Sequence, residues 1–298
     1  MLKSILIIFL IFISSIKCSE NDSILFSFAV FSDNHGDGTE KPEFNKMTEW
    51  IRSNDYKFVI GMGDHIQAKA KNSFIDLLNK NEWWNRNFYP TIADNENGYY
   101  GKNQKDWGAG KKLFNLTDIK SRKNVEFNEN GVEYHAILDE SGINIHFISL
   151  HYPDQPNNDS IAFKESSKKY MTDILKNIDK TDNDIIIIGA HSRLGYWLDR
   201  LNAEQKKIVN EKADLVLSAT THVFHIFSEN GDDGPLVLNT GSITRPRLWS
   251  SSGFVAVDVF QNPLRIEISY IDCSKKKLHY PKYFFRATKF INGRISKN

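Results

Sequence analysis

The sequence ILFSFAVFSDNHGD, residues 24–37, is an apolar run rich in Phe, Ile and Val that stops abruptly at a polar group. Such a run predicts a buried β-strand. Asp33 and His35 follow it directly, and side chains two apart in an extended chain point the same way. We therefore expect a strand that delivers two possible metal ligands, Asp33 and His35, to the loop at its C-terminal end.

Four later strand-like runs end in the same manner. The residues that follow them are Gly63-Asp64, Asp94-Asn95-Glu96, Ala190-His191 and Thr220-Thr221-His222. A single Asp-x-His sequence usually marks a turn. Five strand exits of this kind in one chain are hard to produce by composition alone, so they indicate one shared site.

The order of elements predicts an α/β fold. Helices are expected at residues 42–54, 73–80, 162–178 and 203–212, and buried strands at 57–62, 87–92, 143–150, 184–188 and 214–218. Asn130-Gly131 predicts a hairpin. Strand, helix and strand in succession favour parallel pairing with a crossover connection. Residues 223–272 alternate short strands with turns and predict an antiparallel meander, while residues 97–122 predict a long loop.

The composition is that of an ordinary globular protein. The chain has 298 residues, of which 40% are hydrophobic and 25% charged. We expect one domain over residues 24–272 and a basic C-terminal tail, 273–298, without a core pattern. The formal charge is only +1, which gives no electrostatic reason to expect a nucleic acid partner.

The N-terminus predicts a secretory signal peptide over residues 1–18. Lys3 precedes an apolar run that is too short to span a membrane comfortably, and small and polar residues follow up to Cys18. Cys18 could instead be the lipid-modified first residue of a bacterial lipoprotein, although Lys17 fits such a site poorly. A secreted or cell-surface location is expected, with no transmembrane segment beyond the signal peptide.

Taken together, these motifs resemble the signature of the calcineurin-like metallophosphoesterases, the superfamily that includes purple acid phosphatases and many phosphodiesterases. The residues that carry the likeness, in order and spacing, are Asp33-x-His35, Gly63-Asp64, Asn95, His191 and the run DLVLSATTH, which ends at His222. The likeness covers about residues 24–272. It implies two packed mixed β-sheets flanked by helices, a four-layer sandwich.

The resemblance also implies a site for two divalent metal ions, such as Mn, Zn or Fe. Asp33, His35 and His222 would bind the first ion, Asn95 and His191 the second, and Asp64 would bridge the two. Imidazole and carboxylate are usual ligands for these metals. The implied activity is hydrolysis of phosphate mono- or diesters by a metal-bridging hydroxide, with a small phosphate ester as substrate.

Two departures from the family pattern leave a second interpretation open. Thr220 replaces a histidine ligand, which would weaken the second metal site, and Glu96 replaces the catalytic histidine that follows the asparagine. Glu96 could donate a proton only if its pKa were raised, and loss of a general acid typically reduces the rate about 10²–10⁴-fold. The alternative is a catalytically impaired pseudoenzyme that binds a ligand or a partner.

Several other residues could contribute to the site. Arg193 is a candidate for binding a phosphate oxygen, and His65 could support Asp64. The segment LNTGSITRPR, residues 238–247, could receive a substrate anion or could simply close a turn. An aromatic rim for a nucleoside, sugar or lipid group, or ordinary packing, could come from Trp83, Trp84, Tyr99, Tyr100, Trp107, Tyr196 and Trp197.

Overall fold

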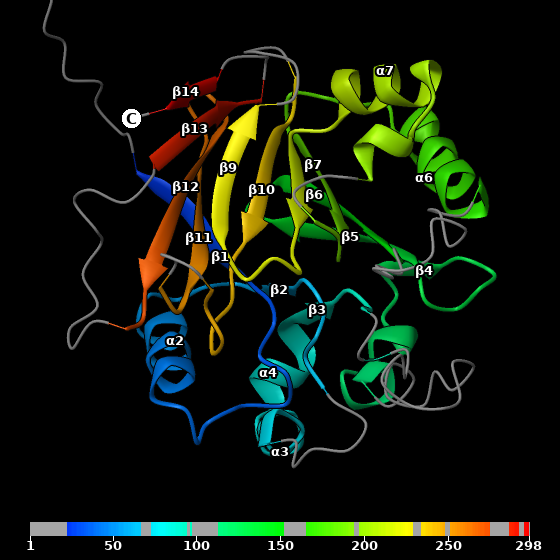
Figure 1. Cartoon of the computed structure of the whole chain (residues 1–298). Helices are drawn as coiled ribbons and strands as arrows, with labels where there is room; N and C mark the ends of the chain where they lie inside the picture. The colour runs from blue at the N-terminus through cyan, green and yellow to red at the C-terminus, as the bar shows by residue number, and fades with distance from the viewer. Residues whose placement is uncertain are drawn as a thin grey trace, which may run out of the picture.

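Two seven-stranded β-sheets stand side by side in the computed structural model (Figure 1). The structure describes residues 23–66, 73–93, 96, 113–151, 165–193, 197–228, 234–247, 251–274, 286–291 and 295–297. In spatial order the first sheet contains β14 (Ile295–Lys297), β13 (Arg286–Phe290), β12 (Arg265–Asp272), β11 (Gly253–Phe260), β1 (Ile24–Phe31), β2 (Val59–Gly61) and β3 (Phe88–Pro90).

The second sheet is also mixed. Its strands are, in spatial order, β4 (Val125–Phe127), β5 (Tyr134–Glu140), β6 (Ile143–Leu150), β7 (Asp184–Ala190), β8 (Leu215–Ser218), β10 (Leu236–Thr240) and β9 (Phe224–Ser228). Strands β6, β7, β8 and β10 run parallel, and so do β1, β2 and β3. The predicted α/β class with two mixed sheets is confirmed.

Helices flank the two sheets. They are α2 (Pro42–Ser53), α3 (Ser73–Lys80), α4 (Glu82–Asn87), α6 (Glu165–Asn177) and α7 (Ala203–Lys212), with 3₁₀ turns at Ile119–Ser121 and Leu198–Arg200. Helix α7 begins at the residue that the sequence predicted, because Asn202 and Gln205 form a capping box. Figure 1 shows α6 and α7 beside the second sheet and α2, α3 and α4 at the opposite end.

Alternating side chains of the second sheet serve two separate cores. In β7, Ile185 and Ile187 belong to the large core that also includes the first sheet, whereas Ile186 and Ile188 belong to the core under α6 and α7. This is the two-residue period of a strand that is buried on both faces. The continuous run DIIII is explained by this double burial.

Two sequence predictions require correction. The predicted meander over residues 223–272 is divided between the sheets, since β9 and β10 pair in the second sheet and β11 and β12 pair in the first. The predicted tail, 273–298, contributes β13 and β14 to the first sheet, and Ala287 and Ile291 join the large core. The domain therefore extends beyond Asp272.

The hairpin prediction at Asn130-Gly131 is confirmed, because β4 and β5 pair antiparallel around it. Among the described residues, every helix is too short or too polar to cross a membrane. The predicted signal peptide and most of the predicted loop at 97–122 lie outside the described residues.

Candidate metal centre

The loops that follow β1, β2, β7 and β8 are joined by backbone hydrogen bonds. The amide of His35 donates to the carbonyl oxygen of Asp64 at 2.7 Å, which joins the first two loops. The amide of Ala219 donates to the carbonyl oxygen of Ser192 at 3.1 Å, which joins the other two. Each of these bonds lies within one sheet, and the bond from Nδ1 of His191 to the carbonyl oxygen of Met62 links the two pairs of loops. The site therefore lies at the carboxyl ends of the parallel strands, where ligands bind in open α/β sheets.

Four of the predicted ligands have left-handed backbone conformations. The φ angles are 54° for Asp33, 50° for His35, 54° for Asp64 and 60° for His222. Residues with a Cβ atom rarely adopt positive φ, and such strain is concentrated at functional sites because the surroundings must enforce it. The concentration of strain at these strand ends supports a functional role for the four side chains.

Asp33 is at the centre of the cluster. Its Oδ1 atom lies 3.2 Å from Nε2 of His222, 3.9 Å from Nε2 of His191 and 4.0 Å from Nε2 of His35. Asp33 is fully buried, yet Oδ1 makes no hydrogen bond of acceptable geometry. A buried carboxylate oxygen without such a bond is costly, so this atom is expected to have another partner, such as a cation.

Asp64 lies against one histidine from each predicted ion site. Its Oδ2 atom is 3.9 Å from Nδ1 of His35 and 3.6 Å from Nε2 of His191. This position suits the bridging role predicted for Asp64. Asp33 is shared as well, because it belongs to one group with His35 and His222 and to another with Asp64 and His191.

Backbone carbonyl groups fix the orientation of two imidazoles. Nδ1 of His191 donates to the carbonyl oxygen of Met62 at 2.5 Å, and Nδ1 of His222 donates to that of Arg245 at 2.6 Å. In each ring Nε2 therefore faces the carboxylates. Metal-binding histidines usually donate their second ring N–H to an acceptor in this way, which sets the tautomer.

The ionised form of Asp33 is stabilised by its neighbours. Burial alone would raise its pKa, but the interactions with His222 and His191 hold the pKa below its ordinary value. Ser32 donates to Oδ2 of Asp33 at 2.6 Å, so that oxygen is occupied while Oδ1 faces the imidazoles. The buried carboxylates and correctly oriented imidazoles fit divalent metal ions of the Zn, Mn or Fe type.

The second predicted ion site is described only in part. His191 and Asp64 are in place, but Asn95 lies outside the described residues. Thr220, at the histidine position of the family pattern, has φ of 81°, and its buried hydroxyl oxygen has no hydrogen-bond partner. A neutral hydroxyl is a weak ligand, so weaker binding of the second ion remains the prediction.

His65 supports the site without belonging to either group of ligands. Its Nδ1 donates to Oδ1 of Asn34 at 2.8 Å, and its Nε2 accepts from the amide of Gly63 at 3.0 Å. Burial lowers the pKa of His65 to about 3, so the ring is neutral. The ring thus joins the loops after β1 and β2, a connection that sequence spacing alone did not show.

The surroundings of Glu96 favour a structural role over the proton donation that the sequence predicted, and its catalytic role stays a prediction. It is fully buried. Oε1 accepts from the amides of His65 and Ile66 at 2.5 and 2.9 Å, and Oε2 accepts from those of Asp64 and Ala93, both at 3.0 Å. Burial and the charge of Asp64 raise its pKa to about 7, whereas the amide donors favour the carboxylate. Glu96 therefore fixes the loop that carries Asp64.

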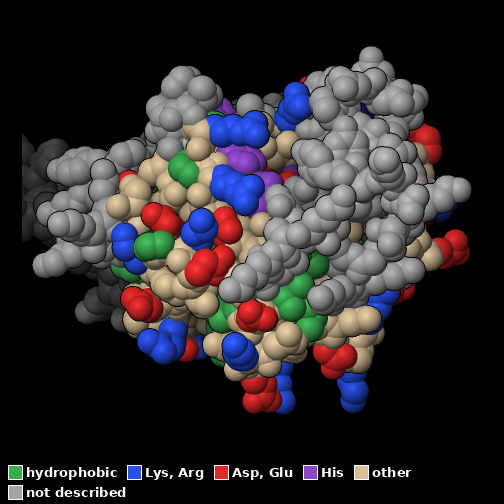
Figure 2. Space-filling model, turned by 60° about the horizontal axis from the view of Figure 1, so that its bottom comes forward, with side chains coloured by type: hydrophobic (Ala, Val, Ile, Leu, Met, Phe, Trp, Pro, Cys, Tyr) green, Lys and Arg blue, Asp and Glu red, His purple; other side chains and the backbone are tan. Residues whose placement is uncertain are grey.

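The segment 238–247 also positions ligands. The hydroxyl of Ser242 donates to the carbonyl oxygen of Asp33 and accepts from the amide of Arg245, each at 2.9 Å. These two hydrogen bonds favour a structural role for the Gly-Ser turn. Arg245 and Arg247 are exposed beside His222. Figure 2 shows histidine side chains at the surface between two groups of Lys and Arg.

Arg193 is exposed and lies two residues after His191. Its predicted contact with a phosphate oxygen is not tested and stays a prediction.

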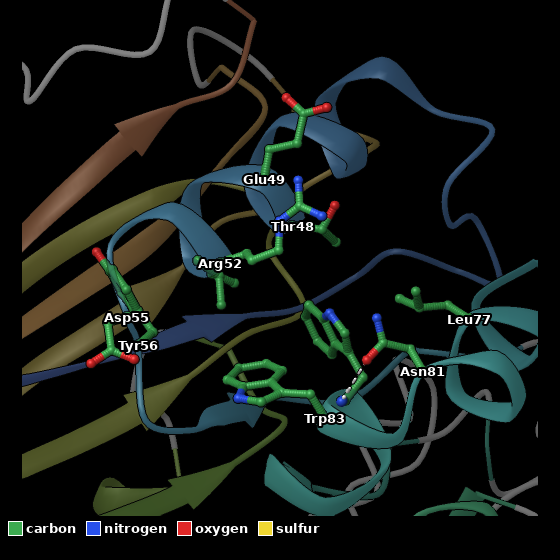
Figure 3. A pocket seen from close by; sticks show the side chains of 10 residues that line it. Thr48, Glu49, Arg52, Asp55, Tyr56, Leu77, Asn81 and Trp83 are labelled. Atoms are coloured by element: carbon green, nitrogen blue, oxygen red, sulfur yellow. Dashed lines mark hydrogen bonds between the residues drawn. The ribbon is translucent and has the colours of Figure 1, made fainter.

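The proposed aromatic rim receives little support. Trp84 and Trp197 are buried in the cores. Trp83 lines a separate cavity of about 550 Å³ between α2 and α4, together with Arg52 and Asp55 (Figure 3). None of the predicted ligands lines this cavity. The other aromatic residues of the proposed rim, Tyr99, Tyr100, Trp107 and Tyr196, lie outside the described residues.

Comparison with known families decides the assignment. The model of the calcineurin-like phosphoesterase family matches residues 26–224, which is more than half of the 298 residues. The chain belongs to the calcineurin-like phosphoesterases. Membership confirms the resemblance found in the sequence and the predicted class of activity, hydrolysis of phosphate esters. No curated protein matches this phosphoesterase significantly.

Several solved structures are similar in fold. A 5′-nucleotidase from Candida albicans is 14% identical, with a TM-score of 0.49 over 86% of this chain and 52% of that one. The NAD nucleotidase of Haemophilus influenzae is 14% identical, with a TM-score of 0.47 over 92% and 53%. A phosphoesterase from E. coli is 13% identical, with a TM-score of 0.45 over 90% and 100%. The phosphoesterase described here spans about half the length of the two nucleotidases.

Proposed function

We propose that this protein hydrolyses phosphate mono- or diesters with the help of two divalent metal ions bound by Asp33, His35, Asp64, His191 and His222. The observation that carries the proposal is the buried Oδ1 atom of Asp33, which has no hydrogen bond and has three imidazoles within 4.0 Å. Asn95 is proposed as a further ligand of the second ion from the family pattern alone.

Metal ions in such a site lower the pKa of bound water to about 7 and polarise the phosphoryl group. The chain's own residues prepare that chemistry. Ser32 and Ser242 hold Asp33, and the carbonyl groups of Met62 and Arg245 orient His191 and His222. The exposed guanidinium groups of Arg245 and Arg247 beside His222 supply positive charge that attracts a phosphate anion.

Both oxygens of Glu96 accept from backbone amides, so Glu96 is poorly placed to protonate the leaving group. Esters with good leaving groups, such as aryl phosphates, need little protonation and should react fastest. We therefore propose a strong dependence of the rate on the pKa of the leaving group.

A pseudoenzyme that binds a ligand or partner is the second candidate. The observations that favour it are the weak ligand Thr220 and the structural use of Glu96. In that case the site would bind one ion at most and a phosphate-containing ligand would not be turned over.

An extracytoplasmic location, secreted or at the cell surface, is part of the proposal. It rests on the signal-peptide pattern of residues 1–18, with Lys3 before a short apolar run. Fractionation of cells that express the full chain, with N-terminal sequencing of the mature protein, tests it. Cleavage near Cys18 is expected, and an uncleaved cytosolic chain would contradict it.

Turnover of p-nitrophenyl phosphate and bis-p-nitrophenyl phosphate, with Mn, Zn and Fe added in turn, tests the enzymatic proposal. We expect metal-dependent turnover of at least one ester, which disappears in Asp64→Ala. One bound ion or none, without turnover of any ester, would favour the binding protein, and turnover that persists in Asp64→Ala would place the chemistry elsewhere.

A further inference from the structure

A second cluster of imidazoles lies on the outer face of the second sheet, away from the catalytic site. Nε2 of His135 on β5 and Nδ1 of His146 on β6 are 3.1 Å apart. The register explains the contact, because His135 faces Ile148 and His146 faces Ile137, which makes the two histidines diagonal neighbours on one face.

A carboxylate orients His146. Nε2 of His146 lies 3.5 Å from Oδ1 of Asp184 on β7. Asp184 is itself fixed, since it accepts from the amide and hydroxyl of Thr181, each at 2.6 Å, and from Asn144 at 3.0 Å. A carboxylate that faces one ring nitrogen keeps the proton there and leaves the lone pair on the other. Nδ1 of His146 therefore presents its lone pair toward His135.

The separation of the two nitrogens suits a shared cation. Two imidazole nitrogens that bind one Zn²⁺ at about 2.0–2.1 Å are roughly 2.9–3.4 Å apart for right-angled to tetrahedral geometry. The observed 3.1 Å falls in this interval and is also an ordinary hydrogen-bond distance, with the ring centroids 5.3 Å apart. Binding of the ion would therefore replace the hydrogen bond between the rings and require a small rotation of them. Burial, with the neighbouring His146, lowers the pKa of His135 to about 4, so its ring is neutral and can act as a ligand at pH 7.

The surroundings of the pair favour a positive ion. His135 and His146 line a cavity of about 630 Å³, and its described lining includes four carboxylates, Glu126, Asp173, Asp179 and Asp184, but no Lys or Arg. Asp173 forms an ion pair with Lys169, which is not among the described lining residues. Lys180, which lies nearby, forms an ion pair with Asp214 at 2.7 Å. The net charge around the imidazoles is therefore negative.

A candidate for a third protein ligand stands on the neighbouring strand. Glu126 on β4 is directly opposite His135 in the β4–β5 register, so both side chains stand on the same face of the sheet. Its carboxylate is exposed and can turn toward the imidazoles. Water from the open cavity would complete the coordination.

We propose that His135, His146 and Glu126 form a second binding site for a divalent transition-metal ion of the zinc type, separate from the catalytic centre. Asp184 acts as the residue that orients His146. The ion would join β4, β5 and β6 at the edge of the second sheet, and it would stabilise that edge without taking part in hydrolysis.

Zinc content per chain tests the proposal. The full-length protein and the double variant His135→Gln/His146→Gln are equilibrated with Zn²⁺, dialysed and measured by mass spectrometry of the metal. We expect the double variant to hold one zinc ion fewer than the native chain, with unchanged turnover of the aryl phosphate. His225→Gln on β9, an exposed histidine outside the cavity, is the matched control and should retain the native content.

A second variant keeps the test decisive if the double variant folds poorly. Asp184→Asn preserves the side-chain shape and should weaken zinc binding at this site about 10-fold or more, as titration calorimetry would show. Equal zinc content in native and double-variant proteins, or equal zinc affinity in Asp184→Asn, would overturn the proposal and leave the two histidines as a hydrogen-bonded structural pair.

Discussion

Glu96→Gln separates a structural role from a catalytic one. In the native chain four backbone amides donate to its two carboxylate oxygens. The glutamine keeps one oxygen, and its NH₂ group faces two amides that then lack an acceptor. A buried amide without a partner costs about 1–3 kcal/mol, so the variant should lose about 2–6 kcal/mol of unfolding free energy. This is a large part of the 5–15 kcal/mol typical of a domain.

Urea denaturation of metal-free protein measures this change directly. Glu211→Gln, an exposed change on α7, is the control and should shift the unfolding free energy by less than about 0.5 kcal/mol. A role as general acid predicts a different result. Glu96→Gln would then unfold like the native chain, and turnover would fall about 10²–10⁴-fold. The native enzyme would lose turnover at high pH as Glu96 lost its proton, and the variant would not show this loss. That combination would refute the structural role of Glu96.

Three further predictions follow from particular contacts. Gly63→Ala should reduce both stability and metal content, because the new Cβ would lie 2.8 Å from Nδ1 of His191. Gly142→Ala, also at positive φ but in open space, is the control and should reduce stability alone. Thermal unfolding and metal analysis compare the two variants. Ser242→Ala should lower unfolding free energy by about 1–3 kcal/mol and reduce turnover, and unchanged turnover would show that this hydroxyl does not position the metal ligands. The unfolding free energy should fall as pH drops from about 6.5 to about 4. The pKa of the buried His135 is lowered to about 4, so in this range the unfolded chain binds a proton that the folded chain does not. Denaturation at a series of pH values should show a smaller change of unfolding free energy with pH for His135→Gln.

The sequence was informative wherever apolar runs were long and sharply bounded. β6 and α7 have the predicted bounds, and β7 contains its predicted run. A strand that is buried on both faces has an unbroken apolar run, which is easy to recognise in the sequence. The convergence of Asp33 and Asp64 also followed from the sequence, because β1 and β2 are parallel neighbours whose carboxyl ends lie at one edge of the first sheet.

Long-range backbone partners could not be inferred. Three of the four amides that donate to Glu96 lie 30, 31 and 32 residues away in sequence, and main-chain groups leave no mark on side-chain patterns. For this reason the sequence suggested a catalytic role for Glu96 but not the structural one. The same limit hid the contact of Ser242 with Asp33, which spans 209 positions.

The assignment of strands to sheets failed for a similar reason. Alternation in residues 223–272 identifies strands but not their sheet, and the chain crosses from the second sheet to the first between β10 and β11. The last two strands were missed because residues 273–298 are rich in basic residues. Pairing with β12 places β13 beside the core, and β14 pairs in turn with β13.

The most direct test of the metal centre is the Mn²⁺ content of the native chain and of Asp33→Asn. Asp33 belongs to both groups of ligands, so the isosteric change should remove bound Mn²⁺ from both ion positions and abolish ester turnover together. Asp37→Asn, in the same loop but outside the ligand groups, should retain the bound Mn²⁺, because its carboxylate pairs with Lys41 and Arg245. If Asp33→Asn bound as much Mn²⁺ as the native chain, the carboxylate would not be at the centre of the site.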